Sequence, residues 1–86
     1  MNNKIKILIT DDNVEFTYEL KEILEKEKDF EVCGIAHDGN EALSLIREKH
    51  PDLITLDVVM PNLDGIGVLK ALSAFRPSDR PYTIVI

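Results

Sequence analysis

The chain alternates short apolar runs with longer stretches of helical periodicity, and this alternation limits the folds available to it. Runs rich in apolar residues lie at 5–10, 30–36, 53–56 and 82–86. The stretches between them space apolar residues three and four apart, as amphipathic helices do. Four strands alternating with three helices predict an α/β fold with a parallel sheet, right-handed crossovers and helices on both faces, which is a three-layer α/β/α arrangement.

Capping and breaking residues bound the predicted helices. The first begins at Val14 and fades over the charged residues that follow it. Asp38 caps the second, with Glu41 at capping-box spacing, and Pro51 forbids continuation beyond the preceding histidine. Asp64 is the predicted N-cap of the third, after a loop over 60–63. The apolar positions are Phe16, Leu20, Ile23 and Leu24 in the first helix, Ala42, Leu43 and Ile46 in the second, and Ile66, Val68, Leu69 and Leu72 in the third.

Three aspartates follow two of the predicted strands. Asp11 and Asp12 come directly after the first apolar run, and Asp57 ends the third. If the two strands are neighbours in a parallel sheet, the three carboxylates meet at one edge, where open sheets bind ligands. Two carboxylates about 4 Å apart repel by roughly 4 kcal/mol at an effective dielectric constant near 20. Such a group must bind a cation or become partly protonated, so the sequence predicts a cation site.

Composition narrows the function classes. The 86 residues are 44% hydrophobic, which suits one small domain spanning 1–86. Ten basic and 16 acidic residues give a net charge of −6 without a basic block, so this segment is not expected to bind nucleic acid. The lone Cys33, predicted to fill the core, excludes a disulfide framework, and no apolar stretch reaches the ~20 residues that span a bilayer. We therefore expect a cytoplasmic protein that does not enter the membrane.

These motifs, taken in order, resemble the receiver domain of two-component response regulators. The resemblance is carried by the Asp-Asp-Asn triplet at 11–13, by the segment AHDGNEAL at 36–43 and by PDLITLDVVMPNLDG at 51–65. It implies a flavodoxin-like fold. Within the family, the segments at 5–7, 34–36 and 63–65 are most similar to receivers of regulators that initiate sporulation in endospore-forming bacteria.

The resemblance also implies a chemistry for the three aspartates. Asp57 would be the phosphoacceptor, taking a phosphoryl group from a phosphohistidine on a sensor histidine kinase or a histidine phosphotransfer protein. Asp11, Asp12, Asp57 and the main-chain carbonyl of Val59 would hold Mg²⁺, with Mn²⁺ or Ca²⁺ as substitutes. The domain would signal rather than act as an enzyme. Its output would be transcriptional, through a DNA-binding domain outside this segment.

The chain departs from the family pattern at its end. A receiver normally has five strand–helix units, with a Ser or Thr after the fourth strand and a Lys after the fifth. Here the sequence stops at Ile86, within the predicted fourth strand. We therefore interpret it as a C-terminally incomplete receiver, and expect the polypeptide to dimerise or aggregate through the strand edge at 82–86.

Three other hypotheses compete with the interpretation as a phosphorylated receiver. An aspartyl-phosphate phosphatase of the haloacid dehalogenase type needs a second Asp two residues after the nucleophile, where this chain has Val59. A nucleotide-binding module needs a glycine-rich loop, which the turn at 10–13 lacks. An interaction-only receiver would not need the acidic trio. His37 and His50 flank a predicted helix without metal-ligand spacing, so we expect both to be solvated loop residues.

Overall fold

The computed structural model describes residues 3–57 and 64–86, and its elements follow the predicted order. The strands are β1 (Ile5–Thr10), β2 (Phe30–Ala36), β3 (Leu53–Leu56) and β4 (Tyr82–Val85); the helices are α1 (Val14–Glu25), α2 (Gly39–Lys49) and α3 (Gly65–Leu72). A short 3-10 helix, η1 (Pro77–Asp79), lies in a stretch predicted as loop, with a proline at its first turn. The predicted strands and helices are confirmed to within a residue or two.

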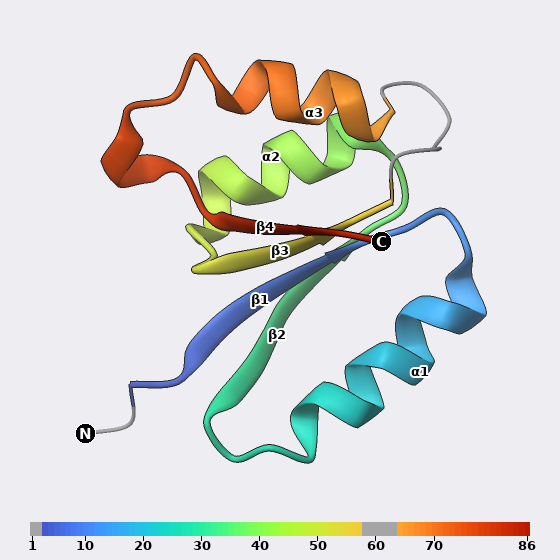
Figure 1. Ribbon diagram of the computed structural model, residues 1–86. Coiled ribbons are helices and arrows are strands. Elements are labelled where there is room, and N and C mark those ends of the chain that lie inside the picture. Colours follow the sequence, from blue (N-terminus) through green and yellow to red (C-terminus); the bar gives the residue numbers. More distant parts are fainter. Residues whose placement is uncertain (1–2, 58–63) are drawn as a thin grey trace.

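The strands form a parallel sheet in the order β2-β1-β3-β4. Figure 1 shows α1 on one face of this sheet and α2 with α3 on the other. The flavodoxin-like α/β/α fold is therefore confirmed. Strand order reverses at β1, because β2 pairs on one of its sides and β3 on the other. Ligand sites of open parallel sheets lie at such a reversal.

The main core lies between the sheet and the pair α2 and α3. Leu8, Ile54 and Leu56 point to this side from the strands, and each is fully buried. The helices contribute Ala42, Leu43, Ile46, Val68 and Leu72. The predicted inner face of α2 is thus confirmed, and Cys33 packs half-buried against the same cluster. In α3, Val68 and Leu72 are buried, whereas Ile66 and Leu69 are exposed.

The apolar residues of α1 are only partly covered. Phe16 and Ile23 keep 38% and 59% of their surface exposed, while Leu20 and Leu24 are half-buried. Thr17 is the buried residue of this helix, and its hydroxyl donates to the Val14 carbonyl. Among the described elements, α1 packs against β1 and β2 and makes no comparable contact with β3 or β4. The flank of α1 next to those strands therefore stays open.

The exposed side of β4 continues this open flank. The register pairs Leu53 with Tyr82 and Thr55 with Ile84, so these residues share one sheet face. Tyr82 is 81% exposed and Ile84 50% exposed. This is the face that carries α1, because the opposite face holds Ile54 and Leu56 in the main core. None of the helices in the described ranges has the length and apolarity needed to cross a membrane.

Candidate metal centre

The fold brings Asp11, Asp12 and Asp57 together at the carboxyl edge of the sheet. One carboxylate oxygen from each lies within 4.8 Å of those of the other two. The strand ladders continue past the strand ends and fix the backbone at this place. The Asp57 N–H donates to the Thr10 carbonyl at 3.0 Å, and the Asp11 N–H donates to the Ala36 carbonyl at 3.0 Å. The predicted meeting of the three side chains is thus present in the structure.

The turn between β1 and α1 orients the acidic pair. Asp11 Oδ1 accepts from the Asn13 N–H at 2.9 Å, which folds the chain back immediately after the strand. Asn13 is the N-cap of α1: its backbone is extended, and its Oδ1 accepts from the Phe16 N–H at 3.0 Å. This cap was not predicted, although an asparagine just before a helical period is a recognised cap signal.

The surroundings of Asp11 at the carboxyl ends of the strands disfavour its ionised form. Burial raises the pKa of the Asp11 carboxyl, and the charges of Asp57 and Asp12 raise it further, against the lowering effect of the Asn13 N–H bond. Asp11 is 9% exposed, Asp12 is exposed and Asp57 is half-buried. An open hollow of about 420 Å³ lies over the group and is also lined by Phe16 and Ile86.

This donor set fits a divalent cation. Mg²⁺ prefers hard oxygen ligands, is commonly held by one or two carboxylates and keeps several waters, for which an open hollow leaves room. A bound cation would relieve the repulsion that raises the pKa of Asp11. The main-chain carbonyl of Val59 and the loop at 60–63 lie outside the described residues. Asp64 lies within them and caps α3 as predicted, accepting from the Gly67 N–H at 2.8 Å.

His37 contacts this site, which was not predicted from the sequence. Its Nδ1 lies 3.1 Å from the main-chain oxygen of Asp11, and the side chain is half-buried. His37 is a loop residue, as expected, but it is half-buried rather than solvated. A signal was present in the sequence: His37 directly follows the second strand, and a sheet with that strand beside the first places its end near Asp11. His50 is exposed, as expected, and ends α2 in the left-handed conformation, with φ 50°.

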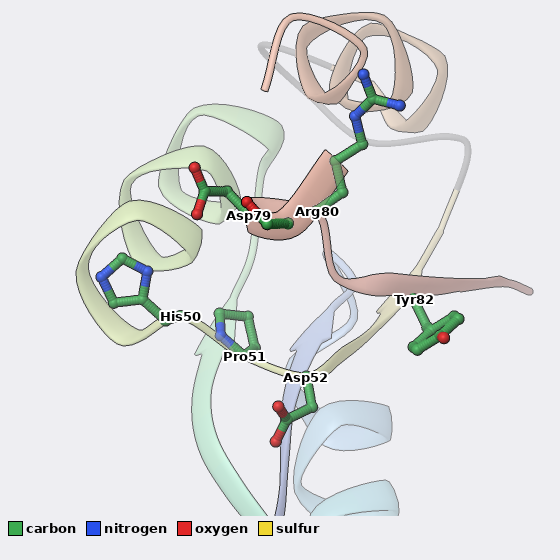
Figure 2. Close-up of a pocket in the computed structure, with 7 residues that line it drawn as sticks. His50, Pro51, Asp52, Asp79, Arg80 and Tyr82 are labelled. Carbon is green, nitrogen blue, oxygen red and sulfur yellow. The ribbon is translucent and has the colours of Figure 1, made fainter. Parts of the chain in front are cut away.

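A second hollow, of about 300 Å³, lies at the amino ends of β3 and β4, away from the three aspartates. Its lining includes His50, Asp52, Asp79, Arg80 and Tyr82, and Figure 2 shows that the Arg80 side chain extends away from the other labelled residues. The Arg80 guanidinium donates to the Phe75 and Ser73 carbonyls. Asp52 Oδ2 accepts from the Lys6 N–H at 2.8 Å. These polar groups hold the backbone around them.

Known proteins resemble the chain over nearly its whole length. A family model described as the response regulator receiver domain matches residues 7–86. A protein-glutamate methylesterase/protein-glutamine glutaminase of Myxococcus xanthus is 42% identical over 80 residues, which are 93% of this chain and 23% of that protein. The chain thus spans about a quarter of the length of this curated relative.

Two solved structures carry the same fold. The response regulator domain of Thermotoga maritima CheB is 37% identical, with a TM-score of 0.84 over 95% of this chain and 59% of that one. A chain of the CheX–CheY complex with BeF3 and Mg²⁺ from Borrelia burgdorferi is 30% identical, with a TM-score of 0.83 over 94% of this chain and 60% of that one. Because the family model covers all but the first six residues, this chain belongs to the response regulator receiver domain family.

Proposed function

We propose that this chain is a phosphoacceptor receiver whose Asp57 takes a phosphoryl group in the presence of Mg²⁺. The observation that carries the proposal is the meeting of three carboxylates within 4.8 Å at the point where strand order reverses. The donor would be a phosphohistidine on a sensor histidine kinase or a histidine phosphotransfer protein. Residues 1–86 would form one receiver unit in the cytoplasm, with a regulatory rather than a catalytic role.

Asp11, Asp12, Asp57 and the Val59 carbonyl would hold the cation, with Mn²⁺ or Ca²⁺ as substitutes. When bound, the cation supplies the positive charge that lets two anions approach each other. Three neighbouring carboxylates would otherwise repel an incoming phosphoryl group. The open hollow beside Phe16 gives the donor a route to Asp57 from solvent.

The transfer itself needs little covalent chemistry from the rest of the protein. An oxygen of the ionised Asp57 attacks phosphorus, the bond between phosphorus and the donor imidazole nitrogen breaks, and that nitrogen keeps the electron pair and takes a proton from solvent. The product is an aspartyl phosphate on this chain and a free histidine on the donor. Positioning is the main contribution of the protein in such transfers. The hydrogen bond from the Asp57 N–H to the Thr10 carbonyl would contribute to it here.

Two kinds of output are proposed. The resemblance noted in the sequence suggests a transcriptional, sporulation-type output through a DNA-binding domain outside this segment. The relatives favour a second candidate, because a methylesterase of M. xanthus and the receiver of T. maritima CheB are 42% and 37% identical to this chain. In that case the receiver would regulate an attached methylesterase. Sequencing the reading frame beyond Ile86 separates the two.

Phosphorylation tests the proposal directly. Incubation of the protein with acetyl phosphate and Mg²⁺ should add one hydroxylamine-labile phosphoryl group, detected by mass spectrometry of the intact chain. Asp57→Asn should abolish the gain. Asp52→Asn, at the other end of β3, is the matched control and should keep it. A label that persisted in Asp57→Asn would place the phosphoacceptor elsewhere and overturn the assignment.

A further inference from the structure

The main chain of Asp11 is held on both sides, by the last residue of β2 and by the residue that follows it. Its N–H donates to the Ala36 carbonyl at 3.0 Å, and its carbonyl oxygen lies 3.1 Å from Nδ1 of His37. That carbonyl belongs to the peptide bond that joins Asp11 to Asp12. Its orientation therefore sets the direction in which the chain, and with it the Asp12 carboxylate, leaves the strand.

The main chain of His37 is itself anchored at the start of α2. The main-chain N–H of His37 donates to Glu41 Oε1 at 2.7 Å, and the main-chain N–H of Glu41 donates to Asp38 Oδ1 at 2.8 Å. These two bonds tie the residue to the first turn of α2. The anchoring differs from the usual capping box, because Glu41 reaches past the N-cap to the residue before it. The ring is half-buried at the end of β2.

The hydrogen-bond acceptor, the Asp11 carbonyl oxygen, decides which ring nitrogen of His37 carries the proton. A carbonyl oxygen can only accept, so the hydrogen bond requires a proton on Nδ1. In a neutral imidazole this leaves Nε2 without a proton. Neutral histidine in water favours the opposite tautomer, and a hydrogen bond of this kind is what reverses the preference.

We propose that His37 is a positioning residue of the metal and phosphoryl site, which it serves by donating from Nδ1 to the peptide between Asp11 and Asp12. The inference rests on the proposed function. Its role is to hold the two carboxylates toward Asp57 before a cation arrives. Groups that orient metal ligands in this way typically change metal affinity by about 10–100-fold when removed.

Two substitutions test this role, because one keeps a ring without the Nδ1 donor and the other keeps a donor without the ring. His37→Phe keeps the ring without a donor, and we expect Mg²⁺ affinity, followed by NMR titration, to fall by about tenfold or more. His37→Asn places an amide N–H at the same number of bonds from Cα as Nδ1, and should bind Mg²⁺ within about threefold of the wild type. His50→Phe, at the far end of α2, is the matched control and should leave binding unchanged.

A second readout needs no metal. Long-range ¹H–¹⁵N NMR of the metal-free protein, at a pH where the ring is neutral, should show His37 protonated at Nδ1. The Asp12 amide shift should move in His37→Phe and return toward the wild-type value in His37→Asn. If His37→Phe fails to fold, His37→Gln replaces it: its donor lies one bond farther out and should not restore Mg²⁺ affinity.

The outcomes distinguish this inference from the proposed function. A neutral ring protonated at Nε2, or wild-type Mg²⁺ affinity in a folded variant without the donor, would overturn the positioning role. Absence of Mg²⁺ binding in the wild type would instead overturn the proposed function. The tautomer and the Asp12 amide shift would then still decide whether His37 holds the turn.

Discussion

Asp11 is the residue at which folding and function oppose each other. Burial and the charges of Asp57 and Asp12 raise its pKa, so the metal-free fold carries an unfavourable carboxylate at neutral pH. The same carboxylate completes the donor set for a cation. A cation that binds here should stabilise the folded protein, because it removes the repulsion among the three carboxylates.

Asp11→Asn should therefore separate stability from metal binding. The amide keeps an oxygen that can accept from the Asn13 N–H but removes one charge from the trio. We expect the metal-free protein to gain on the order of 1 kcal/mol, the repulsion of a carboxylate pair about 4 Å apart that water screens fully, and Mg²⁺ affinity to fall. Urea denaturation and Mg²⁺ titration measure the two effects. A less stable metal-free variant would contradict the electrostatic account.

The raised pKa of Asp11 also fixes the sign of a pH effect. Between the ordinary value of 3.8 and the higher folded value, the folded state binds more protons at this residue than the unfolded state does. The contribution of Asp11 to stability is thus full below pH 3.8 and is lost as pH rises through the folded pKa. Urea denaturation across this range should show a smaller loss in Asp11→Asn than in the wild type. Asp29→Asn, in the exposed turn before β2, should follow the wild type.

At the scale of elements, the cap of α1 links the helix to the site. Asn13 satisfies the Phe16 N–H through its side chain and supports Asp11 through its own N–H. Asn13→Ala should cost about 1 kcal/mol of stability, as lost N-caps do, and weaken Mg²⁺ binding because the turn loosens. Asn13→Ser should restore most of the stability. Denaturation of both variants with and without Mg²⁺ checks this, and equal stability of Asn13→Ala and wild type would refute it.

The elements themselves were predictable because their signals are local. Alternating apolar runs, the caps Asp38 and Asp64 and the breaker Pro51 fixed the order of strands and helices, and a parallel sheet then forced the aspartates to one edge. The contact of His37 with Asp11 was not predicted, because its acceptor is a main-chain oxygen, which no pattern of side chains reveals. Local residue patterns indicate that a segment forms a strand, but they do not indicate which strand pairs with it.

At the scale of the whole molecule, stability should depend on the face of the sheet that α2 and α3 cover. Leu8 is fully buried there, in contact with the central core. Leu8→Ala should cost about 2–5 kcal/mol, because it leaves a cavity between well-packed elements. Ile66→Ala, on the exposed side of α3, should change stability by less than about 0.5 kcal/mol. Similar losses in both variants, measured by urea denaturation, would show that the core is not confined to this face.

The opposite face gives the last prediction, which concerns the 86-residue polypeptide on its own. Phe16, Ile23, Tyr82 and Ile84 leave apolar surface exposed along α1 and β4, and β4 is an edge strand of the described sheet. Exposed strand edges pair with other chains, and large apolar patches associate. We therefore expect this polypeptide to dimerise or aggregate as its concentration rises.

Two isoleucine-to-lysine substitutions identify the surface through which the polypeptide associates. Ile84→Lys places a charge on the open face and should shift the polypeptide toward monomer in light scattering over a concentration series. Ile66→Lys adds the same charge to an isoleucine of similar exposure on α3, away from that face, and should leave association as it was. A wild-type polypeptide that stayed a cooperatively folding monomer of 9.7 kDa at all concentrations would refute the prediction, since the open face would then be tolerated in water without a partner.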